Sequence, residues 1–137
     1  MSDHELTLRQ RINSNCKKVR DEIERECDPM DGHCLVDNMM KLKALGGLMS
    51  ETVALANQEL REKQAEMMKQ DDPELKKIVD IFGKGYIRTW IEAECKKELA
   101  LVEYCVYLDK RVSYAIEALR TAISHLKEEM NRERFGQ

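Results

Sequence analysis

The sequence predicts an all-α protein built from long amphipathic helices. Charged residues make up 36% of the 137 residues, aromatic residues only 5%, and there are just two prolines. Apolar side chains also recur every three or four positions over long stretches. This combination is typical of helices with solvated faces and unlike a β-sandwich or barrel. The length fits one unit, so we expect residues 1–137 to form a single helical domain.

The first helix is predicted over residues 5–27. Its apolar side chains follow one another at spacings of three or four, which places them on one stripe of a helix. They are Leu8, Ile12, Cys16, Val19, Ile23 and Cys27. Pro29 ends this helix because it disfavours helical backbone in the residue before it, and Asp28 or Asp31 can cap the next helix.

The second helix is predicted over residues 34–70, again with one apolar stripe, from Leu35 to Met67. Gly46 and Gly47 lie in its middle, where each glycine weakens a helix by about 1 kcal/mol relative to alanine. Two explanations remain open for this pair: a tolerated weak point or kink, and the close approach of another helix.

The third and fourth helices are predicted over residues 73–83 and 86–134. Asp72 is a good cap and Pro73 suits the first helical position, so a helix begins there. The Gly83-Lys84-Gly85 segment either separates two helices or bends one. We expect two antiparallel hairpins joined near Asp72, in a four-helix bundle or a coiled-coil-like assembly.

A heptad-like seam runs along the last part of the final helix. Its apolar side chains alternate at spacings of four and three, as in coiled coils. They are Val112, Ile116, Leu119, Ile123, Leu126 and Met130. Extended backward, the same phase passes through Asp109 and Glu98, so two charges interrupt it. We predict that this seam is a contact surface, either with the chain's own hairpin or with a second chain.

A second candidate surface combines basic and aromatic side chains, as nucleic-acid surfaces with stacking aromatics do. Its members are Lys84, Tyr86, Arg88, Trp90, Lys96 and Lys97. Glu92 and Glu94 interrupt this segment, and the net charge of the whole chain is −3. Nucleic-acid contact is therefore an alternative rather than the leading interpretation.

The five cysteines give no sign of a site. They are Cys16, Cys27, Cys34, Cys95 and Cys105, mostly at apolar positions of the helical stripes. We expect them to be reduced in a cytoplasmic protein, with no structural disulfide. Cys27, His33 and Cys34 are the nearest approach to a metal cluster, but they lack zinc-ligand spacing. We expect no metal, no cofactor and no catalytic residue, and the N-terminus carries no signal sequence.

Residues 45–64 include the run Thr52-Val53-Ala54-Leu55-Ala56-Asn57-Gln58-Glu59-Leu60. This fragment resembles the second helix of the coiled hairpin in small terminase subunits of tailed phages. The resemblance implies a ring-forming adaptor that helps to load DNA, and it carries no site residues over to this chain.

These observations favour a non-enzymatic helical interaction or assembly protein, acting as a homo-oligomer or with another protein through coiled-coil-like surfaces. The alternative is a nucleic-acid-associated factor of viral or plasmid origin. No segment is apolar enough to span a bilayer, so we expect no membrane contact.

Overall fold

The structure is a computed structural model that describes residues 7–69 and 73–135. Its elements are α1 (Leu8–Ile23), α2 (Gly32–Met67), α3 (Pro73–Phe82), the 3₁₀ turn η2 (Lys84–Tyr86), α4 (Ile87–Glu94) and α5 (Lys96–Phe135). No strand occurs among these residues, and the predicted all-α fold is confirmed.

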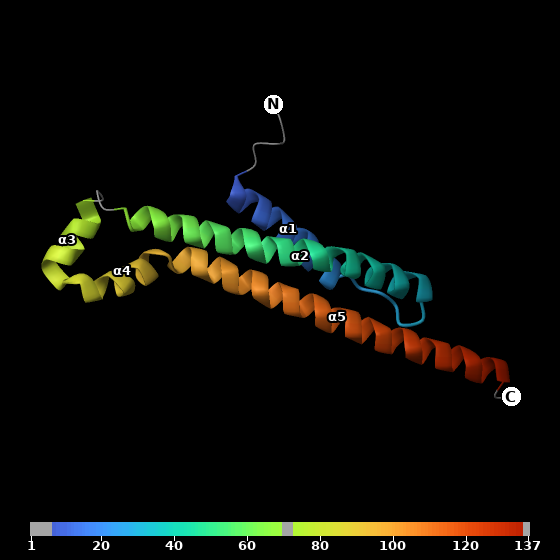
Figure 1. Cartoon of the computed structure of the whole chain (residues 1–137). Helices are drawn as coiled ribbons and strands as arrows, with labels where there is room; N and C mark the ends of the chain where they lie inside the picture. The colour runs from blue at the N-terminus through green and yellow to red at the C-terminus, as the bar shows by residue number, and fades with distance from the viewer. Residues whose placement is uncertain (1–6, 70–72, 136–137) are drawn as a thin grey trace, which may run out of the picture.

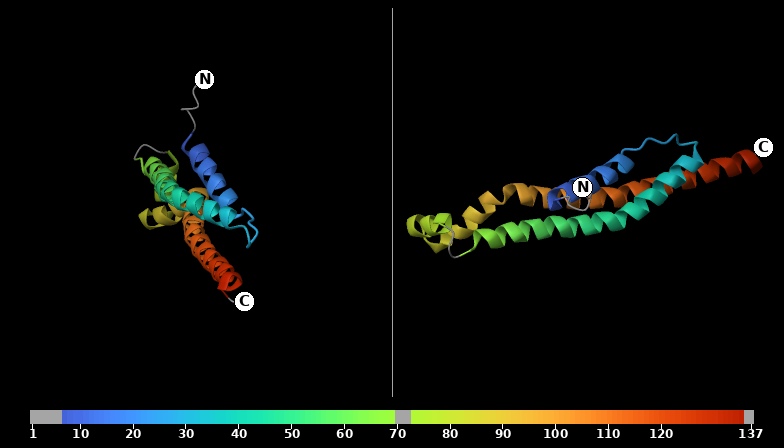
Figure 2. Two further views of the ribbon diagram at one scale, coloured as in Figure 1. Left: turned by 90° about the vertical axis from the view of Figure 1, so that its right-hand side faces the viewer. Right: turned by 90° about the horizontal axis from the view of Figure 1, so that it is seen from above.

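Three long helices form the body of the molecule. α2 and α5 run antiparallel along one another, and α1 lies along their middle part and contacts both (Figure 1). α3, η2 and α4 form a small turn at one end, here called the tip (residues 73–94) (Figure 2). The tip packs mainly within itself. The expected arrangement as two separate hairpins is not confirmed, because α1 contacts both α2 and α5 instead of pairing with α2 alone.

Capping side chains set the start of the first two helices. Thr7 caps α1 through a reciprocal pair of hydrogen bonds with Gln10, so the first helix begins later than residue 5. It also ends earlier than predicted, at Ile23, which leaves Cys27 in the following loop. Asp31 accepts a hydrogen bond from the backbone N–H of Cys34 and starts α2 at Gly32, two residues before the predicted start.

The predicted final helix over residues 86–134 is wrong in one respect, because it is divided at Cys95 into α4 and α5. The division is a bend rather than a gap: the Cys95 N–H donates to Ile91, and the Cys95 carbonyl accepts from Leu99. Gly83 has a φ of +82°, which ends α3, so the glycine segment separates two helices. Asp72, the predicted cap of α3, lies outside the described residues.

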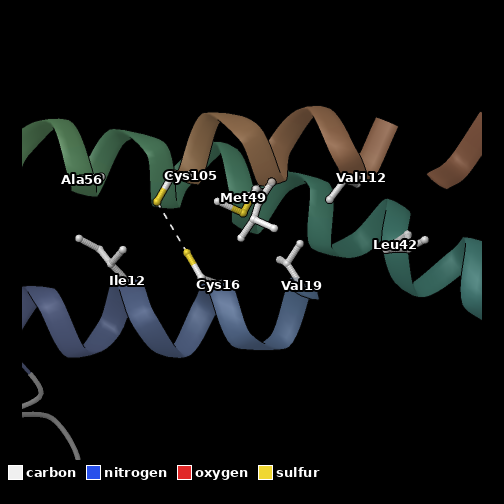
Figure 3. Close-up of a cluster of buried hydrophobic side chains, with 9 residues drawn as sticks. Ile12, Cys16, Val19, Leu42, Met49, Ala56, Cys105 and Val112 are labelled. Atoms are coloured by element: carbon white, nitrogen blue, oxygen red, sulfur yellow. Dashed lines mark hydrogen bonds between the residues drawn. The ribbon is translucent and has the colours of Figure 1, made fainter. Parts of the chain in front are cut away.

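The core lies where the three long helices meet (Figure 3). Each helix contributes three fully or nearly buried side chains at the helical spacing. They are Ile12, Cys16 and Val19 from α1, Leu42, Met49 and Ala56 from α2, and Cys105, Leu108 and Val112 from α5. The apolar stripes predicted for the first two helices therefore point into this core.

Candidate interaction surfaces

The predicted seam of α5 divides into a covered part and an uncovered part. Val112 is 2% exposed and belongs to the core, and Ile116 and Leu119 pack against the core cluster. Leu126 is also buried and lies close to Gly32 at the start of α2. Ile123 is half-buried, whereas Met130 is 58% exposed. Much of the seam therefore packs within the chain, and its last turn does not.

A groove lies where the start of α2 meets the last turns of α5. We call it the C-terminal groove, and its volume is about 470 Å³. It is lined by Met30, Gly32, His33, Val36, Ile123, Leu126, Lys127 and Met130. Met30, Val36 and Met130 are all exposed despite being large and apolar. Such clustering of exposed apolar side chains marks a surface suited to contact with another molecule.

α5 continues past its last buried residue as an uncovered helix. Its free end, residues 127–135, projects past the start of α2 (Figure 1), and every residue in it is exposed. It carries Phe135, which is 77% exposed, as well as Met130. Leu126 is the last buried residue of the helix.

The predicted basic and aromatic surface is only partly brought together. Lys84 and Arg88 line one groove of about 640 Å³ beside Met68 and Ile91. Tyr86 is exposed and stacks on Phe82, with ring centroids 4.6 Å apart. The Arg88 guanidinium pairs with Glu92 at 3.2 Å, which offsets part of the positive charge.

The other three members of the predicted surface lie apart from that groove. Trp90 is half-buried in α4, and Lys96 and Lys97 are exposed at the start of α5. None of the three lines the groove that Lys84 and Arg88 share.

The expectation of five reduced cysteines is wrong for one pair. Cys27 and Cys34 form a disulfide that closes the loop between α1 and α2. The sequence held a signal for it, since two cysteines flank a proline–glycine turn between two antiparallel helices and are thereby brought close. Both thiols are consumed in the bond, His33 is exposed, and the described residues contain no group of three or more potential metal ligands.

A buried charged cluster joins the three long helices. Glu98 of α5 is 9% exposed, and its Oε1 accepts a hydrogen bond from Lys63 Nζ of α2 at 3.1 Å. Arg9 of α1 lies 3.8 Å from the same oxygen and forms a closer pair with Glu59 of α2 at 2.8 Å. A partial signal for this cluster is visible in the sequence, because Glu98 places a charge at an apolar position of the seam.

Opposing effects act on the Glu98 carboxylate. Burial raises the pKa of this carboxyl. The hydrogen bonds that it accepts from the backbone N–H of Glu98 and from Lys63, together with the positive charges of Lys63 and Arg9, outweigh burial, so the pKa lies below its usual value. The cluster is therefore charged near neutral pH and fixes the position of α1 on the α2–α5 pair. Its ion pairs join side chains of α1, α2 and α5, which favours a structural role.

Among the described residues, no helix is long and apolar enough to cross a membrane. Comparisons with protein families, with characterised proteins and with solved structures find no match. The resemblance of residues 45–64 to small terminase subunits thus gains no support, and the surfaces themselves are the basis for a functional proposal.

Proposed function

We propose that the chain is a non-enzymatic assembly protein that pairs with a second copy through the C-terminal groove and the free end of α5. The observation that carries this proposal is the continuation of α5 for residues 127–135 after its last buried residue, Leu126. This extension carries the large apolar side chains of Met130 and Phe135, which are 58% and 77% exposed and would be covered by packing against a second molecule.

The position of the exposed apolar side chains favours a second copy as the partner. Met30 and Val36 on the groove and Met130 and Phe135 on the free end all lie at the same end of the molecule. In a two-fold dimer, each chain supplies the same patch, so the free end of one copy packs in the groove of the other. A contact of this kind covers both surfaces at once.

Size-exclusion chromatography with light scattering tests this proposal directly. We expect the wild-type chain to have the mass of a dimer and Met130→Glu to have the mass of a monomer with unchanged helix content. Tyr114→Glu is the matched control, because Tyr114 is an exposed apolar side chain of α5 outside the groove. A wild-type protein that remains monomeric at about 100 µM, well above typical dimer dissociation constants, contradicts the proposal.

Nucleic-acid contact through the tip is the second candidate function. It is favoured by the exposed Tyr86 ring, which lies between Lys84 and Arg88 in the chain and offers a stacking face beside positive charge. In this case Lys84→Glu with Arg88→Glu abolishes binding to single-stranded DNA at low salt. Lys43→Glu with Lys110→Glu, which changes two exposed lysines elsewhere, leaves binding much less affected. Equal losses in both double variants, or no binding by the wild type, contradict this function.

A further inference from the structure

Two free cysteines face one another in the core. Cys16 of α1 and Cys105 of α5 have their sulfur atoms 3.6 Å apart (Figure 3), although 89 residues separate them in the chain. Cys16 is 4% exposed and Cys105 is fully buried. Both are present as thiols. A disulfide needs its sulfurs about 2 Å apart, so a small movement of the two side chains is enough to bring them to bonding distance.

We propose that Cys16 and Cys105 form a second, reversible disulfide by exchange with a low-molecular-weight disulfide such as glutathione disulfide. Cys16 loses its proton and attacks one sulfur of glutathione disulfide, which gives a mixed disulfide and releases one glutathione thiolate that takes up a proton. Cys105 then loses its proton and attacks the Cys16 sulfur, which releases the second glutathione. Two protein thiols are oxidised and one glutathione disulfide is reduced to two thiols.

The surroundings assign the two cysteines different roles. The hydrogen bond between the two thiols lowers the pKa of Cys16, and the nearby charge of Arg20 also lowers it, while burial acts in the opposite direction. The same hydrogen bond and burial raise the pKa of Cys105. Cys16 is also the less buried of the two. It is therefore the attacking thiol, and Cys105 is the resolving thiol.

The second bond changes how α1 is attached to the rest of the molecule. The Cys27–Cys34 disulfide already joins the loop after α1 to the start of α2. The middle of α1 is held by side-chain contacts of Ile12, Cys16 and Val19 and by the ion pair of Arg9 with Glu59. A bond from Cys16 to Cys105 fixes this middle part to α5, so oxidation turns a docked helix into a covalently held one.

Cys95 provides a matched control within the same chain. It is also a buried free thiol, but its sulfur lies 3.6 Å from the thioether of Met67, which forms no disulfide. Burial also raises the pKa of the Cys95 thiol. Oxidation that is specific to the facing pair therefore spares Cys95.

The test uses the full chain, incubated with glutathione disulfide at temperatures up to about 10 °C below its melting midpoint, so that α1 opens transiently. Remaining thiols are alkylated in denaturant, and the peptides are mapped by mass spectrometry. We expect a peptide cross-linked between Cys16 and Cys105, with Cys95 alkylated. The melting temperature is expected to rise by roughly 10 °C, because the bond closes a loop of about 90 residues. Cys95→Ala gives the same cross-link and the same rise.

Cys105→Ala serves as the second arm, since Cys16 then has no resolving thiol. We expect glutathione to remain attached to Cys16 in this variant, without a cross-link. The proposal is overturned if Cys16 and Cys105 stay alkylatable in the wild type, if glutathione stays on Cys16 when Cys105 is present, or if the cross-link joins Cys95. The wild-type peptide map decides these outcomes even if the alanine variant fails to fold.

Discussion

Glu98 occupies a position in α5 where the helical stripe calls for an apolar side chain. The carboxylate is tolerated because Lys63 donates to it and Arg9 lies nearby, although its Oε2 has no hydrogen-bond partner. A buried charge with such partners adds little net stability. If one member of the ion pair is removed, however, the remaining buried charge has no partner, and its desolvation destabilises the fold. The residue therefore specifies how α1, α2 and α5 fit together more than it strengthens the fold.

The charge of Glu98 leads to a pH dependence of stability. Its pKa in the folded chain lies below the usual 4.5, so the carboxylate contributes stability above that value and loses it as the pH falls through the folded pKa. We expect Glu98→Gln to reduce the free energy of unfolding by about 1 kcal/mol at pH 7, since Lys63 and Arg9 are partly screened by solvent. As the pH falls below the folded pKa of Glu98, the variant and the wild type should converge.

Urea denaturation at several pH values measures this effect. Glu103→Gln, a change at an exposed carboxylate of the same helix, is the control and should leave the pH dependence unchanged. If the stability difference between Glu98→Gln and the wild type does not shrink as the pH is lowered from 7 to the most acidic pH at which both proteins fold, the ion pairs with Glu98 do not contribute in solution.

At the scale of single helices, nothing in the surroundings of the two central glycines of α2 requires a residue without a side chain. A Cβ atom on Gly47 meets nothing within 4 Å, and one on Gly46 lies at an ordinary 3.9 Å from Val112. Close approach of another helix therefore does not explain the pair. Gly83 differs, because its positive φ is a conformation that other residues adopt only with strain.

Alanine substitutions of these two glycines should therefore change the free energy of unfolding in opposite directions. Gly47→Ala should raise the free energy of unfolding by about 0.5–1 kcal/mol, because alanine favours helix and fits without a clash. Gly83→Ala should lower it by about 1–3 kcal/mol, because a φ of 82° with a ψ of 170° is a conformation adopted almost only by glycine. Thermal melting followed by circular dichroism measures both. A Gly47→Ala protein that melts at a lower temperature than the wild type would show that α2 needs its glycine there.

The loop between α1 and α2 carries the next prediction. The Cys27–Cys34 bond closes a short loop, and disulfides of this loop length stabilise proteins by about 2 kcal/mol. In a Cys105→Ala background, where the facing core pair is absent, a reductant should lower the melting temperature by about 5 °C. In the same background with Cys27→Ala and Cys34→Ala, the reductant should have no effect. An equal response in both proteins would contradict a structural role for the bond.

Features that depend on local geometry could be predicted from the sequence, whereas features that depend on which helices become neighbours could not. The helix spacing of Leu8, Ile12, Cys16 and Val19 finds α1 and its buried face, because periodicity depends only on local geometry. The bend at Cys95 could not be predicted in this way, because no proline or glycine lies beside it. The Cys27–Cys34 disulfide has a local signal, since the two cysteines flank one turn, but the facing pair of Cys16 and Cys105 depends on which helices become neighbours, and local patterns do not carry that information.

At the scale of the whole molecule, the same limitation applies to the seam of α5. Its heptad spacing indicates an apolar contact but not the identity of the partner helix. Val112 belongs to the chain's own core, and Ile116 and Leu119 pack against it, so for this part of the seam the contact is internal, one of the two alternatives that the sequence leaves open. The last turns of α5 lack this cover, and only there does the predicted interface remain a proposal.

The length of the molecule provides the last prediction. A compact chain of this size has a radius of gyration of about 14 Å. α5 alone, with 40 residues, is about 60 Å long at 1.5 Å per residue, so an elongated monomer should give about 20 Å. A dimer in which the free end of each α5 packs in the C-terminal groove of the other copy nearly doubles the length, and its radius of gyration should exceed about 30 Å. Small-angle X-ray scattering over a dilution series distinguishes these three values.

The Met130→Glu variant tests whether Met130 contributes to the contact that increases the radius of gyration. If the free ends pair, the wild type should give the larger radius at high concentration, and Met130→Glu should give the monomer value at every concentration, because a charged side chain in an apolar contact has no partner there. Tyr114→Glu should behave as the wild type. A radius near 14 Å with a monomer mass would contradict the elongated arrangement itself. A dimer with a radius near 20 Å would mean that the two copies lie side by side, which contradicts a contact through the free ends and grooves.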